Sequence, residues 1–242
     1  MRFSIAHEHL SFFRRHQAIE FTEFLTLKQL KSLKEAVASV LKERLKVPSV
    51  GPLRRPSAEE RFLVGRDLWR ANAELRHLLT QGRLAEVVGE LSGKRTIRLA
   101  YDQLFPIEST SKWKESEKYS QFLKAVTTLN EASCISPLLC AVMIYLGDSA
   151  SASPISQIRE FNKPLDVFPD VSGNVILFHP DSALDFSQLL NGKIGDYLLV
   201  AYAPPISNYR LNFQDLHVHA LRQLGYTEGE PLNDRCHPMI YS

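Results

Sequence analysis

The spacing of hydrophobic positions changes along the chain from a helical period to a strand period. Residues 1–93 carry apolar side chains mainly three and four positions apart, which is typical of helices that pack one face on a core. Residues 94–205 carry short apolar or alternating runs bounded by turn residues, which predict strands. Residues 206–242 return to a helical pattern and end in a tail. No repeat or long linker separates these parts, so we expect a single domain over residues 1–242.

Two capping boxes mark helix starts in the first part, at Thr26–Gln29 and at Ser57–Glu60. In each, a hydroxyl and a longer polar side chain satisfy backbone N–H groups that the first helical turn leaves without partners. The first of these helices should stop before Pro48, and two further helices after Ser57 should end at Gly93. A short helix and a short strand are expected ahead of them, over His9–His16 and Ala18–Phe24.

The second part predicts four strands, in the segments 95–106, 136–148, 172–180 and 196–205. In the first strand, the alternate positions from Ile97 to Gln103 should share one side. Further helices are expected over Tyr119–Leu129 and Asn212–Leu224. Helices followed by short buried strands, without βαβ alternation, favour an α+β fold in which helices flank an antiparallel sandwich or barrel.

Composition narrows the function only slightly. Hydrophobic residues make up 44% and charged residues 23% of the 242 residues, as in an ordinary globular protein. A net charge of +2 gives no strong field, so we expect neither nucleic acid nor a membrane surface as a partner. No apolar run approaches the roughly 20 residues that span a bilayer. The N-terminus also lacks the apolar stretch of a signal peptide.

The cysteines point to a reducing compartment. Cys134, Cys140 and Cys236 are odd in number and have no C-x-x-C spacing. Buried, reduced thiols are therefore the expectation, and with them a cytoplasmic location.

One short motif raises the question of a metal. His179 and Asp181 lie two residues apart at the end of a predicted strand, as in half of a two-histidine-one-carboxylate iron site. A third ligand would have to come from downstream, where the candidates are His217, His219 and His237. Pro180 cannot donate to a strand ladder, so a strand end followed by a turn is the favoured interpretation.

Three segments, taken in order, resemble the phytanoyl-CoA dioxygenase family. They are "HLSFFRRHQAIEFTEFLTLKQLKSLKEAVASVL", "GRDLW…LAEVVGELSGKRTIRLAYDQLF" and "GNVILFHPDSALDFSQLLN…DYLLVAYA". The likeness covers most of residues 10–203, with the middle poorly matched. It implies a double-stranded β-helix, or jelly roll, with N-terminal flanking helices and a C-terminal helix, which agrees with the pattern of elements above.

The resemblance implies iron(II)- and 2-oxoglutarate-dependent oxygenases, whose iron sits on an early His-x-Asp pair and a late histidine. This sequence departs from that pattern. No histidine lies between positions 106 and 139, and Asp185 stands where the late histidine is expected. The basic residue that should grip the 2-oxoglutarate carboxylate is also missing, because Gly195 and Asp196 occupy its region and Ile107 its alternative position. The metal triad therefore looks lost.

The register implied by the resemblance gives the candidate residues. Asp102, Gln103, His179 and Asp185 are the pocket candidates, and His179, Asp181 and Asp185 are the remaining candidates for a metal. Asp102 and Gln103 have an alternative role in satisfying backbone groups nearby. Asp215, His217 and His219 would chelate poorly from a helix, where positions two apart point to different sides. Arg159 falls in a loop that could hold an anion.

Three functions stay open from the sequence. The leading hypothesis is a divergent phytanoyl-CoA dioxygenase-like protein that binds a small molecule or a protein partner rather than acting as an ordinary oxygenase. No cofactor is then expected. The alternative is an active oxygenase with a non-standard metal site, which would use Fe(II) and 2-oxoglutarate. A third possibility is an interaction scaffold, because a fold alone does not fix a function.

Overall fold

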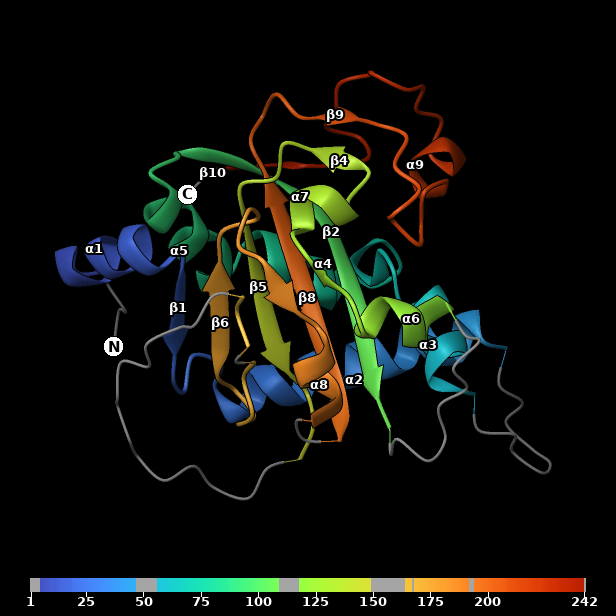
Figure 1. The fold of residues 1–242 in the computed structure, drawn as a ribbon, viewed down its shortest axis with the longest axis horizontal. Coiled ribbons are helices and arrows are strands. Elements are labelled where there is room, and N and C mark those ends of the chain that lie inside the picture. The colour runs from blue at the N-terminus through green and yellow to red at the C-terminus, as the bar shows by residue number, and fades with distance from the viewer. Residues whose placement is uncertain are drawn as a thin grey trace.

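A six-stranded antiparallel sheet organises the chain, with the strand order β1-β6-β5-β8-β2-β10 (Figure 1). The computed structural model describes residues 5–46, 56–108, 118–148, 164–166, 168–191 and 194–241. The strands are β1 (Ala18–Phe21), β2 (Thr96–Ile107), β5 (Cys140–Tyr145), β6 (Val175–Phe178), β8 (Gly195–Ala203) and β10 (Met239–Tyr241). The sheet therefore takes strands from all three parts of the chain.

Helices from the first part lie behind this sheet and along its sides in Figure 1. They are α1 (His7–His16), α2 (Leu27–Arg44), α3 (Ala58–Val64), the 3₁₀ helix η1 (Leu68–Arg70), α4 (Ala73–Thr80) and α5 (Arg83–Ser92). Both predicted capping boxes are confirmed, since Thr26 accepts from Gln29 N–H and Ser57 accepts from Glu60 N–H. In the described ranges, no helix is long and apolar enough to cross a membrane.

Short elements close over the front of the sheet. They are α6 (Lys118–Leu123), β3 (Val126–Thr127), α7 (Leu129–Ala132), β4 (Ile135–Ser136), β7 (Leu184–Asp185), α8 (Ser187–Asn191), β9 (Asn208–Tyr209) and α9 (Ala220–Gln223). β3 pairs with β7 and β4 pairs with β9, both antiparallel. The result is a mixed α/β fold built on a curled antiparallel sheet, and we call the space between the six-stranded sheet and the β3–β7 pair the interior.

The sheet is buried on both faces. One hydrophobic core joins its back face to α2, α4 and α5, and a second core fills the interior. Every residue of β5 and β6 is buried, which explains why their sequences are continuously apolar rather than alternating. The three described cysteines are also buried and free, as the sequence predicts.

A bulge in β2 corrects the predicted alternation. The register of β2 against β8 shifts between Leu99 and Tyr101, so one extra residue enters the strand there. Ile97 and Leu99 therefore belong to the helix-side core, whereas Tyr101 belongs to the interior. The expectation that positions 97–103 share one side is wrong, because the bulge reverses the facing of every residue after it.

Several predicted elements are shorter in the structure. The helix expected over Asn212–Leu224 is present only as α9, and turns fill residues 213–219. The helix expected over Tyr119–Leu129 ends at Leu123, and the strand expected over Ala18–Phe24 ends at Phe21. β10, which sequence patterning did not predict, returns the chain end to the edge of β2.

Arginine contacts fix the segment before β10. Arg98 donates to the backbone oxygen of His237, and Arg70 donates to the Nε2 atom of that buried ring at 3.1 Å. Since arginine only donates, Nδ1 carries the ring hydrogen and donates to the Tyr226 hydroxyl at 2.9 Å. Burial, followed by Arg70, lowers the pKa of His237 to about 3. The imidazole is therefore neutral in the fold.

This neutral histidine makes stability fall in acid. The unfolded chain binds a proton near pH 6.5 whereas the folded chain does not, so stability is lost as the pH falls below about 6.5. Between pH 8 and pH 5, His237 should remove about 2 kcal/mol of unfolding free energy. We expect the stability difference between wild type and His237→Gln, measured by urea denaturation, to shrink by about that amount over this range. An unchanged difference would contradict the buried neutral state.

Candidate functional site

Strand alternation decides which side chains enter the interior. After the bulge, Tyr101, Phe105 and Ile107 of β2 face inward. On the opposite side, Leu184 and Phe186 are fully buried in the same core. Successive side chains of a strand point to opposite faces, so Asp185 between them is directed away from the interior.

Aromatic rings occupy the inward positions around Phe186. Its ring stacks on that of Phe105 at 5.5 Å and lies 4.9 Å from that of Phe122. It also stacks on Phe168 at 6.2 Å. We call these four residues the interior aromatic cluster. Its side chains offer no oxygen or nitrogen atom, so this part of the interior has no donor for a metal ion.

Asp185 makes a local turn instead. It lies opposite Val126 in the β3–β7 pair and is half-buried. Its carboxylate accepts from Gln188 Nε2 at 2.9 Å, and from the N–H and hydroxyl of Ser187 at 3.1 and 2.5 Å. These bonds, led by that of Gln188, lower the pKa of Asp185. The carboxylate is thus an acceptor for the start of α8.

Asp102 lies on the other face of β2, toward the helices. It is fully buried and accepts from the backbone N–H groups of Leu68 at 2.8 Å and Trp69 at 2.9 Å, at the start of η1. Burial, followed by the nearby Asp67, raises the pKa of Asp102 to about 7. It therefore holds η1 against the sheet and lies outside the interior.

Gln103 is buried beside Asp102 in the chain but on the opposite face of β2. Its side-chain amide donates to the backbone oxygens of Phe62 and Leu104, both at 2.9 Å. Its Oε1 atom is buried without a hydrogen-bond partner. The amide thus ties α3 to β2, which is the backbone-satisfying role that the sequence left open.

His179 and Asp181 lie at the surface, at the end of β6. Their side chains are 38% and 65% exposed, and His179 Nδ1 lies 3.6 Å from the Asp181 carboxylate. Asn130 donates to the same carboxylate at 2.6 Å. The structure therefore does not bring the four pocket candidates together. Gln103 lies near the interior and Asp102 on the helix side of the sheet. Asp185 lies on the outer side of β7, and His179 lies at the end of β6. Arg159 falls outside the described residues.

The described residues do not fit an iron and 2-oxoglutarate site. In this part of the chain, no group of three His, Cys, Asp or Glu side chains could hold a metal ion. The strand that faces Asp185 supplies Val126 and Thr127. The position expected to be basic is Asp196, which is itself bound by Arg61 at 2.8 Å. Among the described residues, the positions expected for the late metal ligand and for the basic residue thus hold Asp185 and Asp196.

Sequence patterning missed a buried ionic network next to the interior. Arg66 forms an ion pair with Asp215 at 3.4 Å, and their side chains are only 9% and 4% exposed. The guanidinium also lies 3.4 Å above the ring of Tyr101. Asp215 accepts from the backbone N–H groups of Cys134 and His217 at 2.9 and 2.8 Å. No local motif could reveal this network, because Arg66 and Asp215 are 149 positions apart.

The network controls the charge of His217. Burial, followed by Arg66, lowers the pKa of His217 to about 4, so the ring is neutral at pH 7. Burial disfavours the Asp215 carboxylate, but Arg66 and two backbone N–H groups still hold its pKa below the ordinary value. His219, two positions on, is exposed. The two histidines therefore do not act as a chelating pair.

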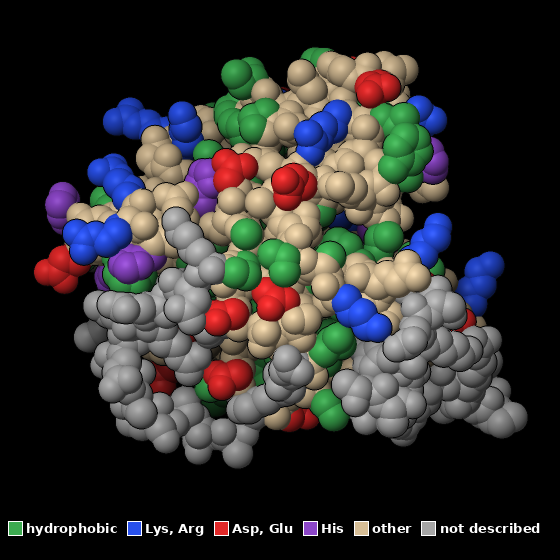
Figure 2. All heavy atoms as spheres, in the orientation of Figure 1, with side chains coloured by type: hydrophobic (Ala, Val, Ile, Leu, Met, Phe, Trp, Pro, Cys, Tyr) green, Lys and Arg blue, Asp and Glu red, His purple; other side chains and the backbone are tan. Residues whose placement is uncertain are grey.

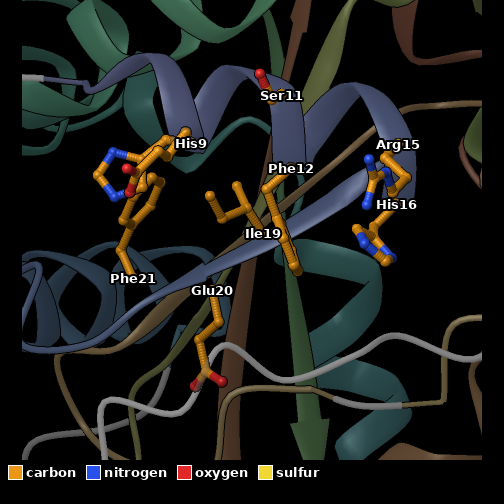
Figure 3. A pocket seen from close by; sticks show the side chains of 9 residues that line it. His9, Ser11, Phe12, Arg15, His16, Ile19, Glu20 and Phe21 are labelled. Carbon is orange, nitrogen blue, oxygen red and sulfur yellow. The ribbon is translucent and has the colours of Figure 1, made fainter.

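Among the surface cavities of the described residues, two lie at apolar side chains outside the interior. One, of about 460 Å³, is lined by α1 and β1; Figure 3 shows Phe12 and Ile19 near its middle and Arg15 and His16 at one end. The other, of about 800 Å³, lies beside α6 and β3. Figure 2 shows acidic, basic and apolar side chains interspersed over one described face of the molecule, with no continuous field of one sign.

No family model matches this sequence, and no curated protein matches it either. Solved structures do. The non-heme α-ketoglutarate-dependent carbocyclase SnoK from nogalamycin biosynthesis is similar with a TM-score of 0.65 at 15% identity, over 98% of this chain and 97% of that one. The epimerase SnoN from the same biosynthesis gives 0.57 at 16% identity, over 95% and 96%. CytC3 with Fe(II) and α-ketoglutarate gives 0.52 at 10% identity, over 86% and 81%. The chain shares its fold with non-heme α-ketoglutarate-dependent enzymes.

Asp102 should be essential for stability. Asp102→Ala leaves two buried N–H groups of η1 without an acceptor, so we expect a loss of about 2–4 kcal/mol in unfolding free energy. Asp181→Ala, at an exposed carboxylate, should cost less than about 1 kcal/mol. Chemical denaturation of both variants measures the contrast, and similar losses would contradict the assigned role.

Neighbouring positions 185 and 186 should behave differently. Phe186→Ala opens a cavity in the interior aromatic cluster and should lower the unfolding free energy by about 3–5 kcal/mol. Asp185→Ala removes only a local turn acceptor and should cost about 1 kcal/mol. The measurement is thermal or denaturant unfolding of the two variants. A larger loss for Asp185→Ala would mean that the facing of β7 is opposite to the one described.

Proposed function

We propose that this protein is a divergent member of the phytanoyl-CoA dioxygenase-like branch that has kept a jelly-roll fold without the iron site. It acts by binding rather than by oxygenation. The observation that carries this proposal is the interior aromatic cluster around Phe186. A non-heme iron centre needs three converging donors with open positions for oxygen and co-substrate, whereas the side chains of this cluster contain no donor atom.

Two further observations support the same conclusion. Asp185, at the expected position of the late histidine, points away from the interior and is bound by Ser187 and Gln188. Asp196, at the expected position of the basic residue, is paired with Arg61 and supplies no positive charge that could hold a carboxylate. The similarity to SnoK and SnoN supports the fold, and function must be argued from the site.

Metal and co-substrate assays test the proposal directly. Freshly purified protein should contain iron or manganese well below one equivalent. Anaerobic calorimetry with Fe(II) or Mn(II) should show no stoichiometric site. The protein should also release no succinate from 2-oxoglutarate above the rate of a heat-denatured control. These outcomes are expected because the described interior offers neither ligands nor a carboxylate grip.

The opposite result would identify an active oxygenase with a non-standard site. That outcome is one equivalent of bound metal that Asp185→Ala removes, together with succinate production that the same variant abolishes. Asp181→Ala serves as the matched control, because its carboxylate is exposed and bound by Asn130. A variant-sensitive metal site would overturn the proposed function.

A further inference from the structure

The larger surface groove has a mainly apolar lining. It lies between α6, β3 and residues 213–219, and its volume is about 800 Å³. The apolar side chains that line it include Phe122, Val126, Phe213, Leu216 and Val218. Binding sites for small molecules commonly measure about 300–1,000 Å³ and have mainly apolar walls, so the groove has the size of such a site.

Large apolar side chains are exposed at this groove. Phe213 is 78% exposed and Val126 is 57% exposed, although both are hydrophobic. Exposed apolar side chains that gather on one patch mark binding surfaces more often than isolated ones do. Phe122 belongs both to the lining of the groove and to the interior aromatic cluster, where its ring lies 4.9 Å from that of Phe186. The floor of the groove is therefore anchored to the core.

The charges at the groove are unequal. Lys118 is exposed at its lining and supplies a positive charge, and His219 is exposed beside it. Among the described lining residues the one acid is Asp215, whose side chain is only 4% exposed. Its carboxylate is neutralised by Arg66 and held by the N–H groups of Cys134 and His217. A ligand in the groove thus meets apolar walls and a cationic rim.

We propose that this groove binds a small carboxylic acid with an apolar body. The body packs on Phe122, Val126 and Phe213, and the carboxylate pairs with the Lys118 ammonium. A neutral molecule would leave the cationic rim unused, and a cation would be repelled by it. The inference goes beyond the proposed function and holds whether or not the interior is catalytic.

A fluorescent probe of matching chemistry tests this site. 1-Anilinonaphthalene-8-sulfonate has an apolar body and one anionic group, and its emission rises when it binds an apolar surface. We expect the folded protein to bind it at one site and decanoate to displace it. Decanol, with the same chain and no charge, and decylammonium, with the opposite charge, should displace it at least tenfold less effectively.

Variants place the binding within the groove. Phe213→Ser and Val126→Ser should weaken binding of the probe at least tenfold while leaving the unfolding temperature close to that of wild type, because both side chains are exposed. Lys118→Glu should remove the preference for decanoate over decanol. The matched controls are Leu27→Ser, at an apolar residue that is 85% exposed on α2, and Lys28→Glu beside it. Neither control should change binding by more than twofold.

Three outcomes would overturn the inference: no binding of either the probe or decanoate, equal displacement by decanol, or equal effects of the control and groove variants. The experiment contains neither metal nor 2-oxoglutarate. Its failure is therefore distinguishable from a failure of the proposed function, which the metal and succinate assays decide.

Discussion

The β-bulge in β2 decides which side chains of that strand face the interior and which face the helices. The register shift between Leu99 and Tyr101 directs Tyr101 and Phe105 into the interior and turns Asp102 toward the helices. Because β2 is buried on both faces, a polar side chain that faced the wrong way would be buried without partners instead of reaching solvent. The bulge therefore fixes which polar groups can meet inside the fold and which serve to hold the helices.

The interior shows how one fold can support different functions. The solved structures that it resembles include enzymes that use iron and α-ketoglutarate. In this chain Tyr101 and Phe105 of β2 and Phe186 at the end of β7 place aromatic rings in the interior, and the acid of β7 lies on its outer side. Stacked rings stabilise the sheet packing by apolar burial. The same burial disfavours any charged ligand that is not paired with an opposite charge.

Local signals in the sequence predicted local structure well. The capping boxes at Thr26 and Ser57 depend on residues three positions apart, and both form as expected. The continuous apolar run at Cys140–Tyr145 predicted a buried strand, and β5 is such a strand. These features need only neighbouring residues, so pattern analysis could find them.

Features that depend on distant residues were not predictable in the same way. The helical pattern of residues 212–224 gives way to turns, because Asp215 points inward to reach Arg66 and the backbone of Cys134. The outward facing of Asp185 depends on the register of β3 against β7. Sequence similarity identified the position of Asp185, but only the register assigns its face. The sequence therefore located the candidate residues along the chain. Which side chains face the interior, and what they bind, could be determined only from the structure.

The ion pair between Arg66 and Asp215 also constrains the order in which the chain can become native. Arg66 belongs to the first third of the sequence, whereas its carboxylate is supplied 149 residues later. A buried guanidinium without its counter-ion is strongly disfavoured. During synthesis on the ribosome, a nascent chain that has not yet exposed Asp215 must keep Arg66 hydrated. The interior around Tyr101 can therefore close only after the chain has been synthesised as far as Asp215.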